Sequence, residues 1–150
     1  MMQNNTALIV VDVQNGFTPG GNLAVVHADQ IIPNINQLAQ YFKTIVITQD
    51  WHPENHVSFA VNHEAKQPFE TIELDYGTQV LWPVHCVQGT SDAELHPKLN
   101  LPSAQLIIRK GCHTHIDSYS AFMESDQKTS TGLAGYLKER GIDTVFIVGI

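Results

Sequence analysis

Four ionisable side chains come at the ends of three apolar runs in this 150-residue chain. Asp12 closes the run that begins at Ala7, Asp50 and His52 follow the run Thr44–Thr48, and Lys110 follows the run Gln105–Arg109. A charged group that is buried without a partner costs several kcal/mol. If these four side chains meet, we therefore expect them to pair with one another, to bind an ion or to carry out chemistry.

The segment Asp50-Trp51-His52 has the spacing of a metal-binding pair. Residues i and i+2 of an extended segment point to the same side, so the carboxylate and the imidazole are presented together. A transition metal needs further ligands, and His56, His63 and His85 follow in the same connection. Oxygen and imidazole ligands suit zinc, iron or manganese and argue against a thiolate site. The spacing alone leaves the third ligand open.

Asp12 and Lys110 form a second candidate pair. Gly111 lets the chain turn sharply after Lys110, so the ammonium can reach the same edge. A carboxylate beside an ammonium is suited to general acid-base chemistry or to the activation of a thiol. Neither Cys86 nor Cys112 stands out as the nucleophile, because free cysteines are usually small buried apolar residues.

Four apolar runs without alternation predict the elements that position these groups. They are the segments 7–13, 44–48, 105–109 and 144–150, and such runs are typical of parallel strands covered on both faces. Apolar residues at helical spacing predict helices within 29–43, with Asp29 as N-cap, and within 130–141, which ends at Gly141. We predict a single α/β domain: a doubly wound, Rossmann-like parallel sheet with helices on both faces, whose strands present ligands at their carboxyl ends.

Composition restricts the class of protein. The formal charge of −7 argues against nucleic acid or an anionic membrane surface as a partner. No run is long enough to span a bilayer, and two cysteines make no disulfide framework, so we expect a cytoplasmic protein. The long connection 53–103 is weakly periodic, and such connections are usually functional. Because 144–150 is an apolar strand at the chain end, we expect the domain to continue beyond Ile150.

Four strings resemble a known family. They are LIVVDVQNGFTPGGNLAV, ITQDWHPENHVSFA, WPVHCVQGTSDAELHP and RKGCHTHIDSYSAF, and in this order they are similar to the nicotinamidases of the isochorismatase-like cysteine hydrolase superfamily. The resemblance covers essentially the whole chain. The DWH and WPxHC strings are similar to those of the metal-dependent branch.

This resemblance implies the hydrolysis of nicotinamide to nicotinate and ammonia through a cysteine thioester, as part of NAD salvage. It implies that Asp12 is the general base and that Lys110 favours the thiolate. It implies a divalent metal, zinc before iron or manganese, that orients the pyridine ring. The implied metal ligands are Asp50, His52 and His85 with His56 as a further candidate, and the implied ring-binding residues are Phe17, Leu23, Trp82 and Tyr119.

The resemblance also implies where the nucleophile lies. In the family the cysteine follows the strand that matches Val145–Gly149, so we expect it after Ile150. A homo-oligomer is also common in the family. Two other functions stay open from the residues: an amidohydrolase in which the metal activates water, and a non-catalytic Rossmann-like module that binds a metal or ligand.

Overall fold

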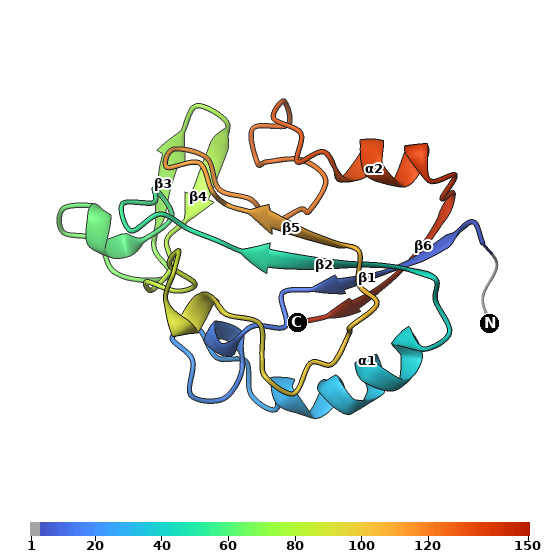
Figure 1. The fold of residues 1–150 in the computed structure, drawn as a ribbon. Helices are drawn as coiled ribbons and strands as arrows, with labels where there is room; N and C mark the ends of the chain where they lie inside the picture. Colours follow the sequence, from blue (N-terminus) through green and yellow to red (C-terminus); the bar gives the residue numbers. More distant parts are fainter. Residues whose placement is uncertain (1–3) are drawn as a thin grey trace.

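The computed structural model describes residues 4–150, and its centre is a four-stranded parallel sheet (Figure 1). The strands are β1 (Thr6–Val11), β2 (Thr44–Asp50), β5 (Leu106–Lys110) and β6 (Thr144–Gly149), in the order β5-β2-β1-β6. All three pairings are parallel. The four predicted strands are therefore present, but β2 and β5 end one or two residues later than predicted, and β1 and β6 end one or two residues earlier. Asp50 and Lys110 are the last residues of β2 and β5, and they are partners in the register.

Helices cover both faces of this sheet, as predicted. In Figure 1, α1 (Ile32–Ala39) lies on one side of the strands and α2 (Leu133–Glu139) on the other. Alternate strand residues pack against each helix: Leu8, Val10, Ile45 and Ile47 form one cluster with Ile32 and Ile35, whereas Ala7, Ile9 and Val46 form another with Leu133 and Leu137. Because both faces are buried, the central strands need apolar residues at successive positions.

The helix ends agree only partly with the sequence. Asp29 was expected to cap the first helix, but it lies inside a 3₁₀ turn, Ala28–Ile31, that runs directly into α1 without a side-chain cap. The expectation is wrong because the 3₁₀ turn already orders the backbone ahead of the helix. Gly141 behaves as expected: it follows α2 with a φ of 66°, and its N–H donates to the carbonyl of Lys138.

The connection 53–103 contains more regular structure than predicted. A hairpin of β3 (Thr71–Leu74) and β4 (Gly77–Val80) lies beyond the carboxyl ends of the main strands (Figure 1), together with 3₁₀ turns at Ala60–Asn62 and Ser91–Ala93; a further 3₁₀ turn, Asn15–Phe17, follows β1. Each hairpin strand has four residues and is only partly buried, so its hydrophobic pattern is weak. Within the described range 4–150, no helix has the length and hydrophobicity to cross a bilayer.

Candidate active site

Asp12 begins the site immediately after β1. Its backbone has a φ of 49°, in the left-handed region, and the N–H of Gln14 returns to its carbonyl at 2.7 Å. Thr48 Oγ1 donates to Asp12 Oδ1 at 2.5 Å from the neighbouring strand β2. The tight turn therefore stops the strand and points a buried carboxylate across the sheet edge. A non-glycine residue in this backbone region is uncommon away from functional sites.

Lys110 joins Asp12 to Asp50. Its ammonium lies 2.7 Å from Asp12 Oδ2 and also donates to Asp50 Oδ1. All three side chains are buried. Burial by itself lowers the pKa of Lys110, but the charges of Asp50 and Asp12 outweigh burial and raise it, so the ammonium stays charged.

The two carboxylates have different pKa values although both contact the ammonium of Lys110. Burial raises the pKa of Asp12, and the opposing effect of Lys110 does not fully offset it. Burial acts on Asp50 in the same direction, but the charge of Lys110 holds the pKa of Asp50 well below its ordinary value. A proton that enters this cluster therefore goes to Asp12 before Asp50, as a general base requires.

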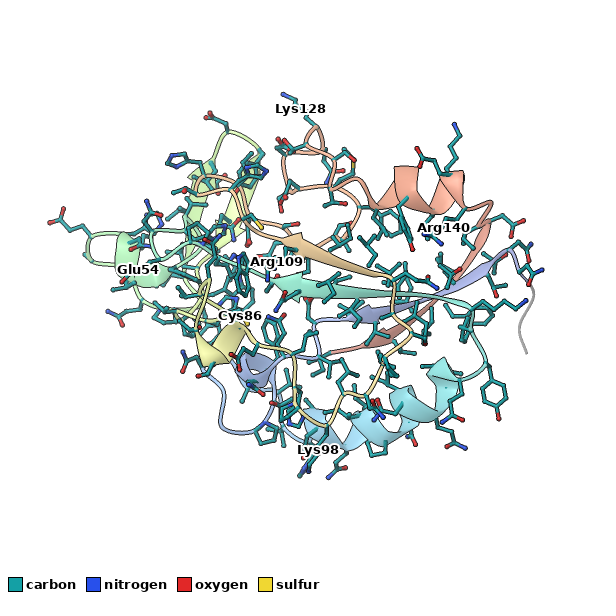
Figure 2. The ribbon with its side chains drawn as sticks, in the orientation of Figure 1. Glu54, Cys86, Lys98, Arg109, Lys128 and Arg140 are labelled. Carbon is teal, nitrogen blue, oxygen red and sulfur yellow. The ribbon has the colours of Figure 1, made fainter. Side chains whose placement is uncertain are left out.

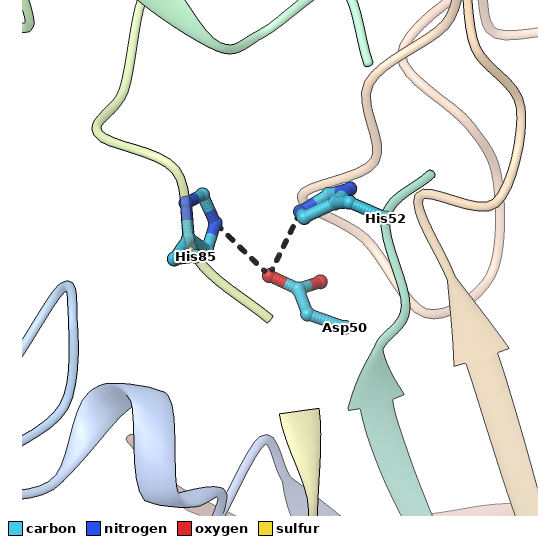
Figure 3. A group of neighbouring side chains, drawn as sticks. All are labelled: Asp50, His52 and His85. Atoms are coloured by element: carbon cyan, nitrogen blue, oxygen red, sulfur yellow. Dashed lines mark ion pairs between the residues drawn. The ribbon is translucent and has the colours of Figure 1, made fainter. Parts of the chain in front are cut away.

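Asp50, His52 and His85 converge on one point (Figure 3). Asp50 Oδ2 lies 3.4 Å from His52 Nε2 and 3.7 Å from His85 Nε2, and one ligand atom from each residue lies within 4.8 Å of the others. Each ring contacts a backbone carbonyl through Nδ1: His52 contacts Gly111 O at 2.9 Å, and His85 contacts Pro83 O at 2.8 Å. A carbonyl only accepts, so both Nδ1 atoms carry the proton when the rings are neutral.

The positions of these protons indicate whether a metal ion fits between Asp50, His52 and His85. With the protons on Nδ1, both Nε2 lone pairs and the Asp50 carboxylate face the same small space, which disfavours the arrangement unless a cation lies between them. An Nδ1 hydrogen bond to a backbone carbonyl is also the usual support of a metal-binding histidine. The donor set of two imidazoles and a carboxylate therefore fits a divalent transition metal.

Of the three candidates for the third ligand, His85 lies beside Asp50 and His52, whereas His56 lies with His52 and Asp117 in a second group of possible ligands. His56 Nδ1 accepts from the Ser58 hydroxyl at 2.7 Å, and His56 Nε2 faces the Ile116 carbonyl at 3.1 Å. Both ring nitrogens are thus already bonded to protein. Burial, with a smaller contribution from His52, lowers the pKa of His56 to about 4, so this ring is neutral at pH 7. His63 is bonded to the Val57 carbonyl instead.

Gly111 allows His52 to sit where it does. Its φ of 64° suits the sharp turn after β5, and a Cβ at this position would lie 2.4 Å from Cε1 of His52. Any larger residue would therefore displace the ring. The expected role of this glycine as a turn is confirmed, and the close approach of the ring is a second reason for it.

These groups line one cavity of about 540 Å³ at the carboxyl ends of the strands. The four residues expected to hold the ring, Phe17, Leu23, Trp82 and Tyr119, all line it together with Asp12, Asp50, His52, His85 and Lys110. Trp82 Nε1 donates to the hydroxyl of Tyr119 at 3.1 Å, which fixes one wall. A larger hollow of about 890 Å³ lies among polar loops and contains none of these charged groups.

Three residues at or next to the cavity were not predicted from the sequence. Phe69 and Asp117 also line the cavity, and the buried amide of Gln14 contacts the backbone of Asp50. Phe69 and Asp117 lie in irregular segments, where spacing indicates no direction. Gln14 could have been predicted from the sequence, because it is a polar residue two positions after Asp12 at the end of a buried strand.

Neither cysteine of the chain lines this cavity. Cys86 lies in the long connection beside the carboxyl ends of the strands (Figure 2), where its side chain is fully buried and its N–H donates to Asp92. Burial raises the pKa of the Cys86 thiol and also that of Cys112. Both thiols therefore stay protonated at neutral pH, which is the opposite of what an attacking cysteine requires.

Comparison with known proteins places this site in a family. The isochorismatase domain model matches residues 6–150. Nicotinamidase from Acinetobacter baylyi is 80% identical over 147 residues, which are 98% of this chain and 69% of that protein. A solved nicotinamidase/pyrazinamidase from Acinetobacter baumannii matches with a TM-score of 0.99 and 75% identity, covering 100% of this chain and 72% of that one.

A second solved structure bears on the metal. It is the pyrazinamidase of Pyrococcus horikoshii in complex with zinc, which matches with a TM-score of 0.77 and 37% identity over 97% of this chain and 70% of that one. The fold and the sequence agree with one another across these comparisons. The chain belongs to the isochorismatase family, within its nicotinamidase branch.

Proposed function

We propose that this protein hydrolyses nicotinamide to nicotinate and ammonia through a cysteine thioester. One observation supports this most strongly: the Asp12–Lys110 pair, the Asp50–His52–His85 donor set and a wall of flat aromatic side chains all line the same cavity. An aromatic slot suits a planar heteroaromatic ring. The name of the Acinetobacter baylyi relative supports the same substrate.

Asp50, His52 and His85 would hold a divalent metal ion, and we propose zinc. When bound, this ion would supply a Lewis acid for the ring nitrogen of the pyridine. The aromatic residues Phe17 and Trp82 would then limit the tilt of the ring, since both line the cavity beside the donor set. The carboxamide would lie towards Asp12 and Lys110.

The reaction itself would use the carboxylate and the ammonium. Asp12 takes the proton of the attacking thiol while sulfur bonds to the carboxamide carbon, and it returns this proton to the departing ammonia. A water then attacks the thioester, Asp12 accepts one of its protons, and the thiol leaves with that proton as nicotinic acid forms. Lys110 stays charged and stabilises the thiolate and the carboxylate beside it.

The nucleophilic cysteine belongs to the proposal as well. Neither Cys86 nor Cys112 lines the cavity, and the Acinetobacter baylyi relative is longer than the region it shares with this chain. We place the nucleophile after Ile150, a residue that lines the cavity. The predictions of a cytoplasmic location and of a homo-oligomer are part of the same proposal.

The experiment uses the complete protein, loaded with zinc and mixed with nicotinamide. Ammonia and nicotinate should appear in equal amounts, and a reaction quenched in acid should show a cysteine that carries the acyl group by mass spectrometry. Turnover with no acyl adduct at any time would favour the alternative in which metal-activated water attacks. No turnover of nicotinamide would contradict the proposed function itself.

A further inference from the structure

Gln14 has a buried side-chain amide next to the site, and all of its hydrogen bonds are to backbone groups. Its side chain is fully buried. Its Nε2 donates to the carbonyls of Asp50 at 2.9 Å and Ala93 at 2.8 Å, and its Oε1 accepts from the N–H of Asp50 at 2.8 Å. Both amide hydrogens are used, and the two carbonyls cannot donate, so the orientation of the amide is fixed.

The place of this amide in the sheet explains its bonds. The N–H and C=O of one strand residue point to the same side, and at Asp50 they point towards β1. However, β1 pairs with β2 only as far as Val10 with Ile47, because the chain turns at Asp12. The side-chain amide of Gln14 therefore takes the place of the missing strand, donating and accepting as a backbone peptide would.

The two hydrogen bonds from Gln14 hold the backbone of Asp50, the residue that contacts both Lys110 and the two histidines of the metal-binding group. Asp50 Oδ1 accepts from Lys110, whereas Asp50 Oδ2 faces His52 and His85. The direction of the carboxylate depends on the backbone of Asp50, which Gln14 holds at both polar groups. Buried backbone groups that lose their partners have to find others, and the strand end would shift to do so.

We propose that Gln14 is a positioning residue that sets the direction of the Asp50 carboxylate and thereby the affinity of the site for its metal. The inference rests on the proposed metal-dependent function. Gln14 touches neither the cavity nor the metal-binding atoms, so its effect passes entirely through the backbone of Asp50.

Gln49 provides a matched control in the same chain. It is also a buried glutamine, and its Nε2 donates to the same Ala93 carbonyl at 2.8 Å. Its Oε1 accepts from Arg109 instead of from Asp50. Gln14→Met and Gln49→Met therefore both remove a buried amide and the bond to Ala93, but only Gln14→Met releases the backbone of Asp50.

The measurement is the zinc affinity of the metal-free complete protein, by competition with a chromophoric chelator, with folding checked by circular dichroism. We expect Gln14→Met to weaken zinc binding about 10- to 100-fold, as loss of a partner that orients a ligand does. We expect Gln49→Met to bind zinc as the unsubstituted protein does. A cobalt-substituted sample should show an altered absorption spectrum for Gln14→Met alone.

Equal zinc affinity in folded Gln14→Met and in the unsubstituted protein would overturn the inference, and so would equal losses in both variants. If Gln14→Met does not fold, Gln14→Asn takes its place, because it keeps the amide but is one methylene too short. In the unsubstituted protein the amide hydrogen of Asp50 should exchange slowly, and fast exchange would overturn the inference without any variant. Absence of zinc binding by the unsubstituted protein would instead contradict the metal site.

Discussion

The single ammonium of Lys110 lies between two carboxylates that have different neighbours. Asp50 also faces two imidazoles, whereas Asp12 contacts Lys110 and the hydroxyl of Thr48. The charge of Lys110 holds Asp50 ionised, while burial makes Asp12 the easier one to protonate. Two identical side chains thus take the roles of metal ligand and proton carrier because of their surroundings.

The Asp12→Asn variant tests the proton-carrying role. The asparagine keeps the shape of the side chain but cannot take the thiol proton, so we expect nicotinamide turnover to fall about 10⁴-fold, as in other enzymes that lose one member of a catalytic group. Zinc binding should remain, because Asp12 is not in the donor set. Ammonia release is the measurement and the exposed Asp75→Asn is the control; turnover near that of the control would refute the assignment.

His56 predicts a pH dependence of stability. Its folded-state pKa of about 4 lies below the ordinary 6.5, so between these values the unfolded chain binds a proton that the folded chain does not. Stability from this residue is therefore complete above pH 6.5 and is lost as the pH falls towards 4. When the pH is lowered from 7 to 5, the unfolding free energy of the metal-free, unsubstituted protein should therefore fall by about 2 kcal/mol more than that of His56→Gln.

The same variant tests whether His56 is a ligand. Because its ring nitrogens are bonded to Ser58 and Ile116, His56→Gln should leave zinc affinity unchanged. His85→Gln should abolish tight binding, since it removes one of three donors. Chelator competition on both variants decides the question: a comparable loss in His56→Gln would place His56 in the metal site.

At the scale of elements, the ends of the strands decide the geometry. β1 stops at a tight turn, β2 continues to Asp50, and β5 ends at Lys110 beside it in the register. The turn at Gly111 then passes under the ring of His52. The irregular connection supplies His85 to this edge.

Gly111→Ala tests the close approach of that turn. Its added Cβ would lie 2.4 Å from His52, so we expect the ring to move and zinc affinity to fall at least about tenfold, as for other changes that misdirect a metal ligand. Gly141→Ala is the matched control, because Gly141 has a similar φ of 66° with no atom within 4 Å of the added Cβ. Both variants should lose a similar amount of stability from backbone strain, but zinc affinity retained in Gly111→Ala would contradict the packing argument.

Particular residues show how far the sequence predicts these elements. Apolar runs such as that of β2 predict a buried strand, and the structure confirms it, because the seven successive buried residues of β2 suit a strand between two layers. The same argument placed Asp12, Asp50, His52 and Lys110 at one edge. It could not choose between His56, His63 and His85, since that choice depends on how the connection folds. The hairpin of β3 and β4 was missed because its strands are short and half exposed.

At the scale of the whole molecule, the strand order places the site. In the order β5-β2-β1-β6, the three strands that supply Lys110, Asp50 and Asp12 are neighbours, and β6 lies on the other side of β1. The direction of strand addition reverses between β1 and β6, and Val11 and Ile150, at the ends of these two strands, also line the cavity, which is the usual position of a ligand in such sheets. The apolar walls come from the connections that extend beyond this edge (Figure 1).

Metal binding should also stabilise the whole fold. Asp50, His52 and His85 come from two separate segments and meet only in the folded chain, so zinc at 100 times its dissociation constant should add about 2.7 kcal/mol. For a domain of this size we expect the thermal midpoint of unfolding to fall roughly 5–10 °C on chelation and to recover with zinc. His85→Gln should show no such response, and a midpoint insensitive to zinc in the unsubstituted protein would argue against a site that needs the fold.

The most direct test of the account is a crystal structure of the complete, zinc-loaded Asp12→Asn protein with nicotinamide, with the metal located by anomalous scattering. We expect the metal between Asp50, His52 and His85, the ring nitrogen towards it, and the carboxamide beside residue 12 and Lys110 in the cavity lined by Phe17 and Trp82. Nicotinamide bound outside this cavity, or a metal held by other residues, would contradict the account.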